Sequence, residues 1–327
     1  MGSFLRHKVV FSRFAGHPRR KDRSRRPLRL LALLSLSLLL ASCAFDYRRV
    51  DPRAAAPLGT ETVQWEPYRR GIHLASLVLE EPPMRLYFAR VALDTPGLRV
   101  ITTPPNGEAP LDTFGMRTTT FARRSGAVLA INASQFRPVE QEPFAPKDVI
   151  GLAVSAGERY SPDEGSQAFV GFRLDGTGVI ARDGDEEAGL PARREEAVEA
   201  AVPLQTAVAG RPVVLEAGRP REFGPARHPR TGVGLSRDGR TLYILVAEGR
   251  MSSRSIGLTL FEVGAWLRHL GAWSGLNLDG GGSTTLVVRD AQGRGEPRRV
   301  NRSVHNPIWG SERVVANHLG FLLEGED

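Results

Sequence analysis

The chain has 327 residues, 41% apolar and 24% charged, which is enough for one large domain or two ordinary ones with a sizeable core. Its net charge of +8 is typical of nucleic-acid binders, but residues 1–42 contribute +9, from ten Lys or Arg and one acid, which leaves about −1 for the rest. Because binding a nucleic-acid backbone needs a localised basic face, this charge distribution excludes nucleic-acid binding by residues 43–327.

The first predicted element is a secretory signal over residues 1–42. A basic stretch ends at Arg29, and an uncharged apolar run from Leu30 to Leu40 follows it. A charged start, an apolar run of about 7–15 residues and small residues before a cleavage site are typical of such a signal. The run is too short for a membrane-spanning helix, which needs about 20 residues. The alternative is a buried core helix.

The tetrapeptide Leu40-Ala41-Ser42-Cys43 resembles the bacterial lipobox, in which the Cys becomes the lipidated N-terminus. Cys43 is the only cysteine in the chain, so lipidation gives an otherwise unexplained thiol a role. Ala44 follows where signals for inner-membrane retention usually have Asp, which favours outer-membrane sorting. We therefore expect a lipid-anchored protein of the bacterial envelope that faces the periplasm, with residues 43–67 as a flexible tether.

Residues 68–327 are predicted to form a single domain in which short apolar runs alternate with Gly, Pro and Asp. Strands are predicted at Ile72–Leu79, Met84–Leu93, Leu98–Thr102, Ala127–Ile131, Val149–Ser155, Ala168–Leu174 and Thr177–Ala181. The charge-dense stretch 182–201 is predicted to be a solvated loop or an exposed helix without a functional role. Many strands and few helices indicate an α+β fold with a mixed, largely antiparallel β-sheet core and a few packed helices.

Two further strands are predicted to form a hairpin. The apolar alternating runs Thr231–Ser236 and Thr241–Ala247 are separated by a turn that contains Asp238-Gly239. Asp-Gly between such runs is a strong hairpin signal, because Gly accepts the positive φ that the tight turn requires.

A capping box predicts a helix over residues 260–270. In Thr259-Leu260-Phe261-Glu262 the Thr side chain can accept from the N3 amide while the Glu reaches back to the Thr amide. Gly271 is placed to end the helix. Apolar side chains recur at helical spacing at Phe261, Ala265, Trp266 and Leu270.

The segment after this helix has the strongest chemical pattern. An apolar strand places Asn277 and Asp279 two positions apart, on one face, and then breaks into Gly280–Gly282 before a second strand begins. Three consecutive glycines lose backbone entropy on folding, which is worthwhile if their amides approach a ligand closely, and such amides suit phosphate oxygens. Ser283 and Thr284 add hydroxyl groups. The missing Lys excludes a nucleotide P-loop, and a plain hairpin turn is the alternative.

This segment, from Leu270-Gly271-Ala272 to Asn277–Ser283, resembles the signature of the phosphodiester glycosidase family. The resemblance covers roughly residues 70–323. Its other blocks follow in family order at Ala130–Phe136, Arg230–Gly234, Val246–Arg250, Val300-Asn301 and Glu312–Asn317. Two departures stand out: Ala133-Ser134 replaces the usual Gly-Gly, which narrows the space near Asn132, and Glu248 replaces the usual Asp.

The resemblance implies a hydrolase that cleaves the bond between a sugar's anomeric carbon and a phosphodiester oxygen. A phosphate monoester leaves readily, so the site needs less general-acid help than an ordinary glycosidase, but it must hold the phosphate and supply a base or nucleophile. The candidate catalytic residues are Asp279, then Glu312 and Glu248. Guanidinium groups match phosphate oxygens bidentately, so arginines are included among the candidate substrate-binding residues, which are Asn132, Arg230, Asn277, Gly280, Gly281, Gly282, Ser283, Thr284 and Arg313.

Each candidate also has a structural interpretation. Arg313 could pair with Glu312 or another acid in a structural bridge, Asp279 could cap the glycine loop, and Glu248 could be an exposed turn residue. Two other functions stay open: a non-catalytic envelope module that binds glycans or phosphorylated polymers, and a hydrolase of cell-wall or exopolysaccharide linkages without phosphate.

No cofactor or metal ion is predicted. The histidines show no metal-binding spacing, and a structural divalent cation at Asp279 is the alternative. A serine nucleophile is not expected either, because neither Gly-x-Ser-x-Gly nor Ser-x-x-Lys is present.

Overall fold

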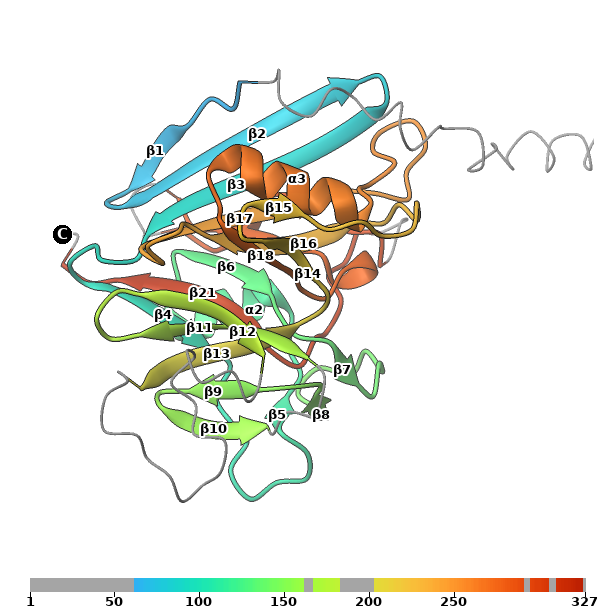
Figure 1. Cartoon of the computed structure of the whole chain (residues 1–327). Helices are drawn as coiled ribbons and strands as arrows, with labels where there is room; N and C mark the ends of the chain where they lie inside the picture. Colours follow the sequence, from blue (N-terminus) through green and yellow to red (C-terminus); the bar gives the residue numbers. More distant parts are fainter. Residues whose placement is uncertain (1–61, 162–166, 183–202, 291–294, 306–309, 326–327) are drawn as a thin grey trace, which may run out of the picture. The chain divides into compact units, whose positions relative to one another are not determined.

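The computed structural model describes residues 62–161, 167–182, 203–290, 295–305 and 310–325. In this part of the chain every strand pair is antiparallel, and two α-helices are present, α2 (Thr118–Ser125) and α3 (Leu260–Leu270). The fold is α+β and rich in antiparallel sheet, as predicted (Figure 1). The predicted signal, Cys43, most of the predicted tether and nearly all of the charge-dense stretch lie outside the described residues.

The largest sheet has eight strands in the order β1-β2-β3-β17-β16-β18-β14-β15. The predicted hairpin is confirmed: its two strands pair along their whole length, and Gly239 in the turn has φ +69. The first strand begins inside the residues assigned to the tether. The strands are β1 (Glu66–Arg69), β2 (Ile72–Glu80), β3 (Pro83–Ala92), β14 (Val213–Glu216), β15 (Arg219–Pro220), β16 (Arg230–Leu235), β17 (Thr241–Ala247) and β18 (Ser274–Asn277).

Two five-stranded sheets and a three-stranded one complete the described fold. The first contains β9 (Ala153–Ser155), β10 (Glu158–Ser161), β11 (Ala168–Arg173), β12 (Gly178–Arg182) and β13 (Leu204–Gly210). The second contains β4 (Leu98–Thr102), β6 (Leu129–Asn132), β19 (Leu286–Val288), β20 (Arg298–Arg299) and β21 (His318–Leu323). The third contains β5 (Thr113–Phe114), β7 (Phe136–Arg137) and β8 (Pro146–Val149).

The single strand predicted over Val149–Ser155 is wrong, because β8 ends at Val149 and β9 begins at Ala153. Gly151 lies between them with φ +96, a conformation that strands do not adopt, and a Cβ at this position would lie 2.6 Å from the Ala209 Cβ. The chain therefore changes sheets at a glycine that both its backbone angle and its close packing require.

The largest apolar cluster joins the eight-stranded sheet to the two five-stranded ones, and it includes Val233, Leu276, Val208, Ile131 and Phe321. The other main cluster lies where α3 covers the eight-stranded sheet (Figure 1). There Val263, Trp266 and Leu267 of the helix are buried against strand residues. The two clusters hold β16, β17 and β18 from both faces, so the ends of these three strands are firmly placed.

The predicted helix 260–270 is confirmed with its capping box. The Thr259 hydroxyl accepts from the Glu262 amide at 3.1 Å, and the Thr259 amide donates to Glu262 Oε2 at 2.8 Å. Gly271 ends the helix with φ +112. The helix returns the chain to the sheet, and β18 then leads directly into the three glycines.

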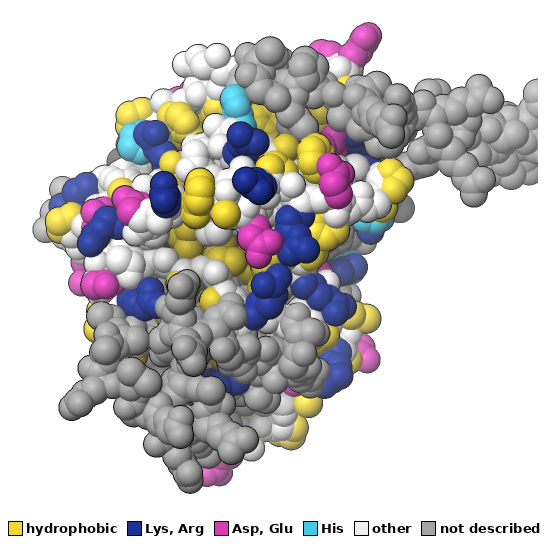
Figure 2. Space-filling view, viewed as in Figure 1, with side chains coloured by type: hydrophobic (Ala, Val, Ile, Leu, Met, Phe, Trp, Pro, Cys, Tyr) yellow, Lys and Arg dark blue, Asp and Glu magenta, His cyan; other side chains and the backbone are white. Residues whose placement is uncertain are grey.

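The face of the molecule in Figure 2 shows basic side chains interspersed with acidic and apolar ones. Among the described residues no helix is long and apolar enough to cross a membrane.

Candidate active site around a triglycine turn

The three glycines link two different sheets. After β18 the chain passes through a short 3-10 helix, η2 (Gly281–Ser283), and enters β19. Strand β18 pairs with β14 and β16, whereas β19 pairs with β6 and β20, so the two strands do not form a hairpin with each other. The plain hairpin turn considered from the sequence is therefore wrong, and the segment is a crossover at the junction of the sheets.

Strand register brings distant residues to this junction. Arg230, the first residue of β16, is opposite Ala247, the last residue of β17, so the residues that follow Ala247 lie next to Arg230. Gly232 of β16 is opposite Asn277, the last residue of β18. Arg230, the segment after Ala247 and the triglycine turn therefore lie together at the same end of these three neighbouring strands.

Asn132 lies behind the turn and holds both of its ends. Its Nδ2 donates to the Asp279 carbonyl at 2.7 Å, and its Oδ1 accepts from the Thr231 hydroxyl at 2.8 Å and the Thr285 amide at 3.0 Å. The side chain is fully buried. Asn132 therefore positions the turn from within the protein.

Two other asparagines hold the turn in a similar way. Asn277 is buried, and its Nδ2 donates to the carbonyls of Arg211 and Leu278 at 2.9 and 2.8 Å. Asn301, for which the sequence suggested no role, accepts from the Leu286 amide at 2.8 Å and donates to the Thr284 carbonyl at 2.9 Å. The entry and exit of the turn are fixed by side-chain amides that a solvent-borne ligand does not reach.

The Ala133-Ser134 departure is accommodated behind the turn. Ala133 and Ser134 are both buried, and the Asp279 amide donates to the Ala133 carbonyl at 2.9 Å. The Ser134 hydroxyl accepts from the Ala209 amide at 3.0 Å and from Asn317 Nδ2 at 3.2 Å. The serine thus adds hydrogen bonds that tie the neighbouring strands together.

The glycine amides are mostly engaged within the protein. The Gly280 amide donates to Asp279 Oδ1 at 2.9 Å, and the Gly281 amide donates to the Pro229 carbonyl at 2.9 Å. The Ser283 and Thr284 amides donate to carbonyls of the turn itself, at 3.2 and 3.3 Å. The turn is therefore not the open cradle of amides that the sequence suggested, and its glycines need another explanation.

Two guanidinium groups supply that explanation. A Cβ added to Gly282 would lie 2.8 Å from Arg313 Nη2, and one added to Gly281 would lie 3.2 Å from Arg250 Nη1. The side-chain space of both glycines is thus taken by arginines. Gly280 is equally constrained, because its Cβ would lie 2.7 Å from the Pro229 carbonyl oxygen. The glycines allow cations, rather than amides, to gather over the turn.

Arg313 and Asp279 meet at the turn. Arg313 Nη1 donates to the Ser283 hydroxyl at 3.3 Å. Burial raises the pKa of Asp279 above its ordinary value, and a hydrogen bond from Ser283, the charge of Arg313 and the Gly280 amide offset part of that rise. Asp279 is partly exposed as a residue, although its carboxyl group is largely buried. The structure therefore brings together a predicted carboxylate and a predicted phosphate ligand.

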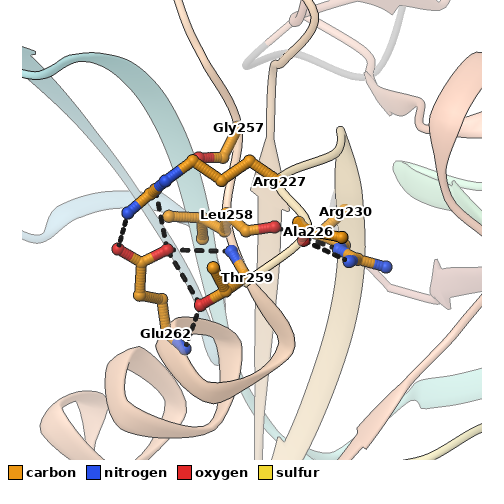
Figure 3. A network of polar contacts seen from close by, with 7 residues as sticks. All are labelled: Ala226, Arg227, Arg230, Gly257, Leu258, Thr259 and Glu262. Atoms are coloured by element: carbon orange, nitrogen blue, oxygen red, sulfur yellow. Dashed lines mark hydrogen bonds and ion pairs between the residues drawn. The ribbon is translucent and has the colours of Figure 1, made fainter. Parts of the chain in front are cut away.

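Arg230 lies next to Gly280 of the turn, where an added Cβ would be 3.8 Å from the Arg230 Cα. Its Nε donates to the Leu258 carbonyl and its Nη2 to the Ala226 carbonyl, both at 3.1 Å (Figure 3). Burial and the neighbouring charge of Arg250 lower its pKa to about 10. Among the described residues no carboxylate is within ion-pair distance of Arg230, Arg250 or Arg313.

Each of the two arginines over the glycines has a histidine partner that the sequence did not identify. Arg250 Nη2 is 3.2 Å from His228 Nδ1, and Arg313 Nε is 3.5 Å from His305 Nδ1. Burial first, and then the adjacent arginine charges, lower the pKa of both histidines below 6.5. Both imidazoles are therefore mainly neutral at pH 7, and their Nδ1 atoms can accept from the guanidinium groups.

Glu248 is fully buried, so its interpretation as an exposed turn residue is wrong. Its carboxylate is 2.6 Å from Arg254 Nε and accepts from the Tyr87 hydroxyl at 3.0 Å and the Arg302 amide at 2.6 Å. Arg254 neutralises the charge of this carboxylate. The structure therefore places Glu248 as a support for the segment around Asn301.

Glu312 is placed at the start of α2 rather than at the turn. Its Oε2 accepts from the Thr119 amide at 3.0 Å, and the helix has no acidic residue of its own in its first turn. A carboxylate there satisfies an unpaired amide and complements the helix dipole. The structural bridge to Arg313 is absent among the ion pairs of the described residues.

The described residues contain no group of three or more His, Cys, Asp or Glu side chains that could hold a metal ion. What the junction offers is one carboxyl group of raised pKa within a set of guanidinium groups. Such an arrangement can bind an anionic ester and supply a base or nucleophile next to it.

The model of the family described as phosphodiester glycosidase matches residues 125–322. The SPbeta prophage-derived uncharacterized protein YomE of Bacillus subtilis (strain 168) is 26% identical over 211 residues, which make up 63% of this chain and 29% of that protein. The chain thus spans less than a third of the length of this relative.

Two solved structures share the fold. The catalytic domain of zebrafish N-acetylglucosamine-1-phosphodiester alpha-N-acetylglucosaminidase, auto-inhibited by its pro-peptide, matches 80% of this chain over 88% of its own length, with TM-score 0.55 and 19% identity. A hypothetical protein from Synechocystis matches 81% of this chain over 64% of its own length, with TM-score 0.58 and 16% identity.

Proposed function

The chain belongs to the phosphodiester glycosidase family, and from this premise we propose that it hydrolyses a sugar-1-phosphodiester at the triglycine turn. The observation that carries the proposal is the position of Asp279 next to Arg313, at a turn that two further arginines also approach. An anionic ester is attracted to such a set of cations, and the carboxyl group is then next to the bond that breaks.

In the proposed reaction Arg313 holds the phosphodiester, while the buried Ser283 hydroxyl accepts from Arg313 and donates to Asp279. Asp279 either takes the proton from an attacking water or attacks the anomeric carbon itself, and in the second case a water molecule then hydrolyses the resulting glycosyl ester and restores the carboxylate. The bond between the anomeric carbon and the ester oxygen breaks, and its electron pair leaves with the phosphate. The guanidinium groups stabilise the charge that develops on that oxygen, so the leaving group needs little protonation. The products are the free sugar and a phosphate monoester.

The proposal is tested by comparing two substrates that share a sugar. One is N-acetylglucosamine joined through phosphate to methanol, and the other is the matching methyl glycoside without phosphate. We expect the release of free sugar from the phosphodiester to be at least about 100-fold faster, because only this substrate uses the guanidinium groups. Turnover of the plain glycoside alone would favour a hydrolase of linkages without phosphate. Binding of the phosphodiester without any turnover would favour a non-catalytic module.

We also propose that the enzyme acts in the bacterial envelope, with its lipid anchor at Cys43 in the outer membrane and its domain in the periplasm. The support is the lipobox-like sequence after a charged start and an apolar run. Fatty-acid labelling of the wild-type protein and of Cys43→Ser tests the anchor, since a label that persists in the variant excludes it.

A further inference from the structure

The positive charge at the turn exceeds what one phosphodiester requires. The guanidinium groups of Arg230, Arg250 and Arg313 bring three positive charges to the turn, and among the described residues Asp279 is the one carboxyl group in contact with the turn and these arginines. Glu248 does not reduce the excess, because Arg254 neutralises it. A phosphodiester has a single negative charge, so one uncompensated guanidinium would remain after it binds, even with Asp279 ionised.

The arginines form two groups. Arg313 is bonded to Ser283 and lies over Gly282, next to Asp279. Arg250 lies over Gly281, whose amide donates to the carbonyl of Pro229, and its charge lowers the pKa of Arg230. Two like charges held together without a carboxylate favour an anion from outside the protein. One group is thus available for the reacting phosphate and the other for a second anion.

The contrast with Arg227 supports this interpretation. Arg227 is three residues from Arg230, and its guanidinium is paired with Glu262 at 2.6 Å, with both side chains almost fully buried. The same network fixes the segment that supplies the Ala226 and Leu258 carbonyls to Arg230 (Figure 3). Arg230 is therefore held rigidly by neutral acceptors, while the adjacent arginine has its own carboxylate. This is the arrangement expected for a preorganised anion-binding group.

We propose that the natural substrate has a second phosphate next to the scissile phosphodiester, as in a chain of sugars and phosphates, and that Arg230 and Arg250 bind this second phosphate. The proposal rests on the proposed function for the identity of the first phosphate. Arg250 is exposed, so a chain that extends from the turn into solvent can reach it.

The test measures binding by calorimetry in an Asp279→Asn background, so that no ligand is consumed. The first two probes are N-acetylglucosamine 1-phosphoglycerol and the same compound with a phosphate on the far glycerol hydroxyl. We expect the second probe to bind about tenfold more tightly, because it makes charge-assisted hydrogen bonds that the first probe lacks. A third probe, the methyl ester of N-acetylglucosamine 1-diphosphate, distinguishes a chain from a diphosphate, and tighter binding of this probe would overturn the assignment to a chain.

Arg250→Gln should remove most of this preference, and Arg230→Gln should do the same. Arg237→Gln is the matched control, since Arg237 lies beyond the opposite end of β16 and stacks on Trp273. Equal affinities of the Asp279→Asn protein, with all three arginines intact, for the first two probes would overturn the proposal, as would a preference that survives Arg250→Gln. Because binding is measured without turnover, preferential binding of the second probe by the Asp279→Asn protein, together with no hydrolysis by the wild-type protein, would refute the proposed function alone.

Discussion

Replacement of Asp279 with Asn is expected to lower kcat/KM for a sugar-1-phosphodiester by about a thousandfold, which is within the range for loss of a positioned general base. Asn has nearly the same shape and keeps an oxygen that can accept from the Gly280 amide, as Asp279 Oδ1 does at 2.9 Å. The turn should therefore persist while the charge that activates water, or attacks the sugar, is lost. Steady-state kinetics with unchanged thermal unfolding would confirm this role, and equal rates in both proteins would remove Asp279 from the mechanism.

The pH profile separates a base from an acid at this position. Burial raises the pKa of Asp279, and a base or nucleophile must be ionised. The wild-type kcat/KM should therefore be level above this raised pKa and fall as the pH drops through it. The Ser283 hydroxyl lowers the pKa of Asp279 by donating a hydrogen bond to it. In Ser283→Ala this bond is lost, so the pKa of Asp279 rises and the falling limb of the profile should move to higher pH. A rate that rises toward low pH would instead assign Asp279 as an acid.

Loss of the Arg313 guanidinium should have the second-largest effect. Arg313→Gln is expected to lower kcat/KM by about 100-fold, because the phosphate loses a charged ligand both when it binds and when it leaves. The falling limb of the pH profile should also move to higher pH, because the charge of Arg313 lowers the pKa of Asp279 and this effect is lost in the variant. Arg313→Lys should recover part of the rate, because it keeps the charge but loses the planar fork. Full activity in Arg313→Gln would show that the phosphate binds elsewhere.

A glycine substitution can displace this guanidinium without removing it. In Gly282→Ala the added methyl would lie 2.8 Å from Arg313 Nη2, so the side chain must move and kcat/KM should fall, by less than in Arg313→Gln. Gly224→Ala is the matched control, because no heavy atom lies within 4 Å of its added Cβ. Equal activity of both alanine variants would mean that the position of Arg313 over Gly282 is not needed.

Local signals in the sequence were enough for some elements and not for others. The capping box at Thr259 and the Asp238-Gly239 turn are encoded within a few residues, and both were predicted correctly. Helix α2 was missed because its start has no side-chain cap of its own, and the carboxylate that serves it, on Glu312, is 193 residues away. The order of strands in the sheets depends on similar long-range pairing, which no short pattern contains.

The same distinction applies to the site. The family resemblance indicated Asp279, Arg230 and Arg313, which the fold brings to one turn. Arg250 and His228 come together only through the pairing of β16 with β17. No pattern in the sequence marks His228 as a site residue, because the histidines lack metal-binding spacing. The roles expected for Glu248 and Glu312 depended on what surrounds their carboxylates. Arg254 and the start of α2, respectively, engage them in the folded chain.

The central claim is that the bond between sugar and oxygen breaks, and not the bond between phosphorus and oxygen. Hydrolysis of N-acetylglucosamine 1-(methyl phosphate) in water enriched in oxygen-18, followed by mass spectrometry of both products, tests this claim most directly. The arrangement of Asp279 and Arg313 predicts that the label enters the anomeric hydroxyl of the released sugar and that the methyl phosphate stays unlabelled. Label in the phosphate would contradict the claim and make the protein a phosphodiesterase.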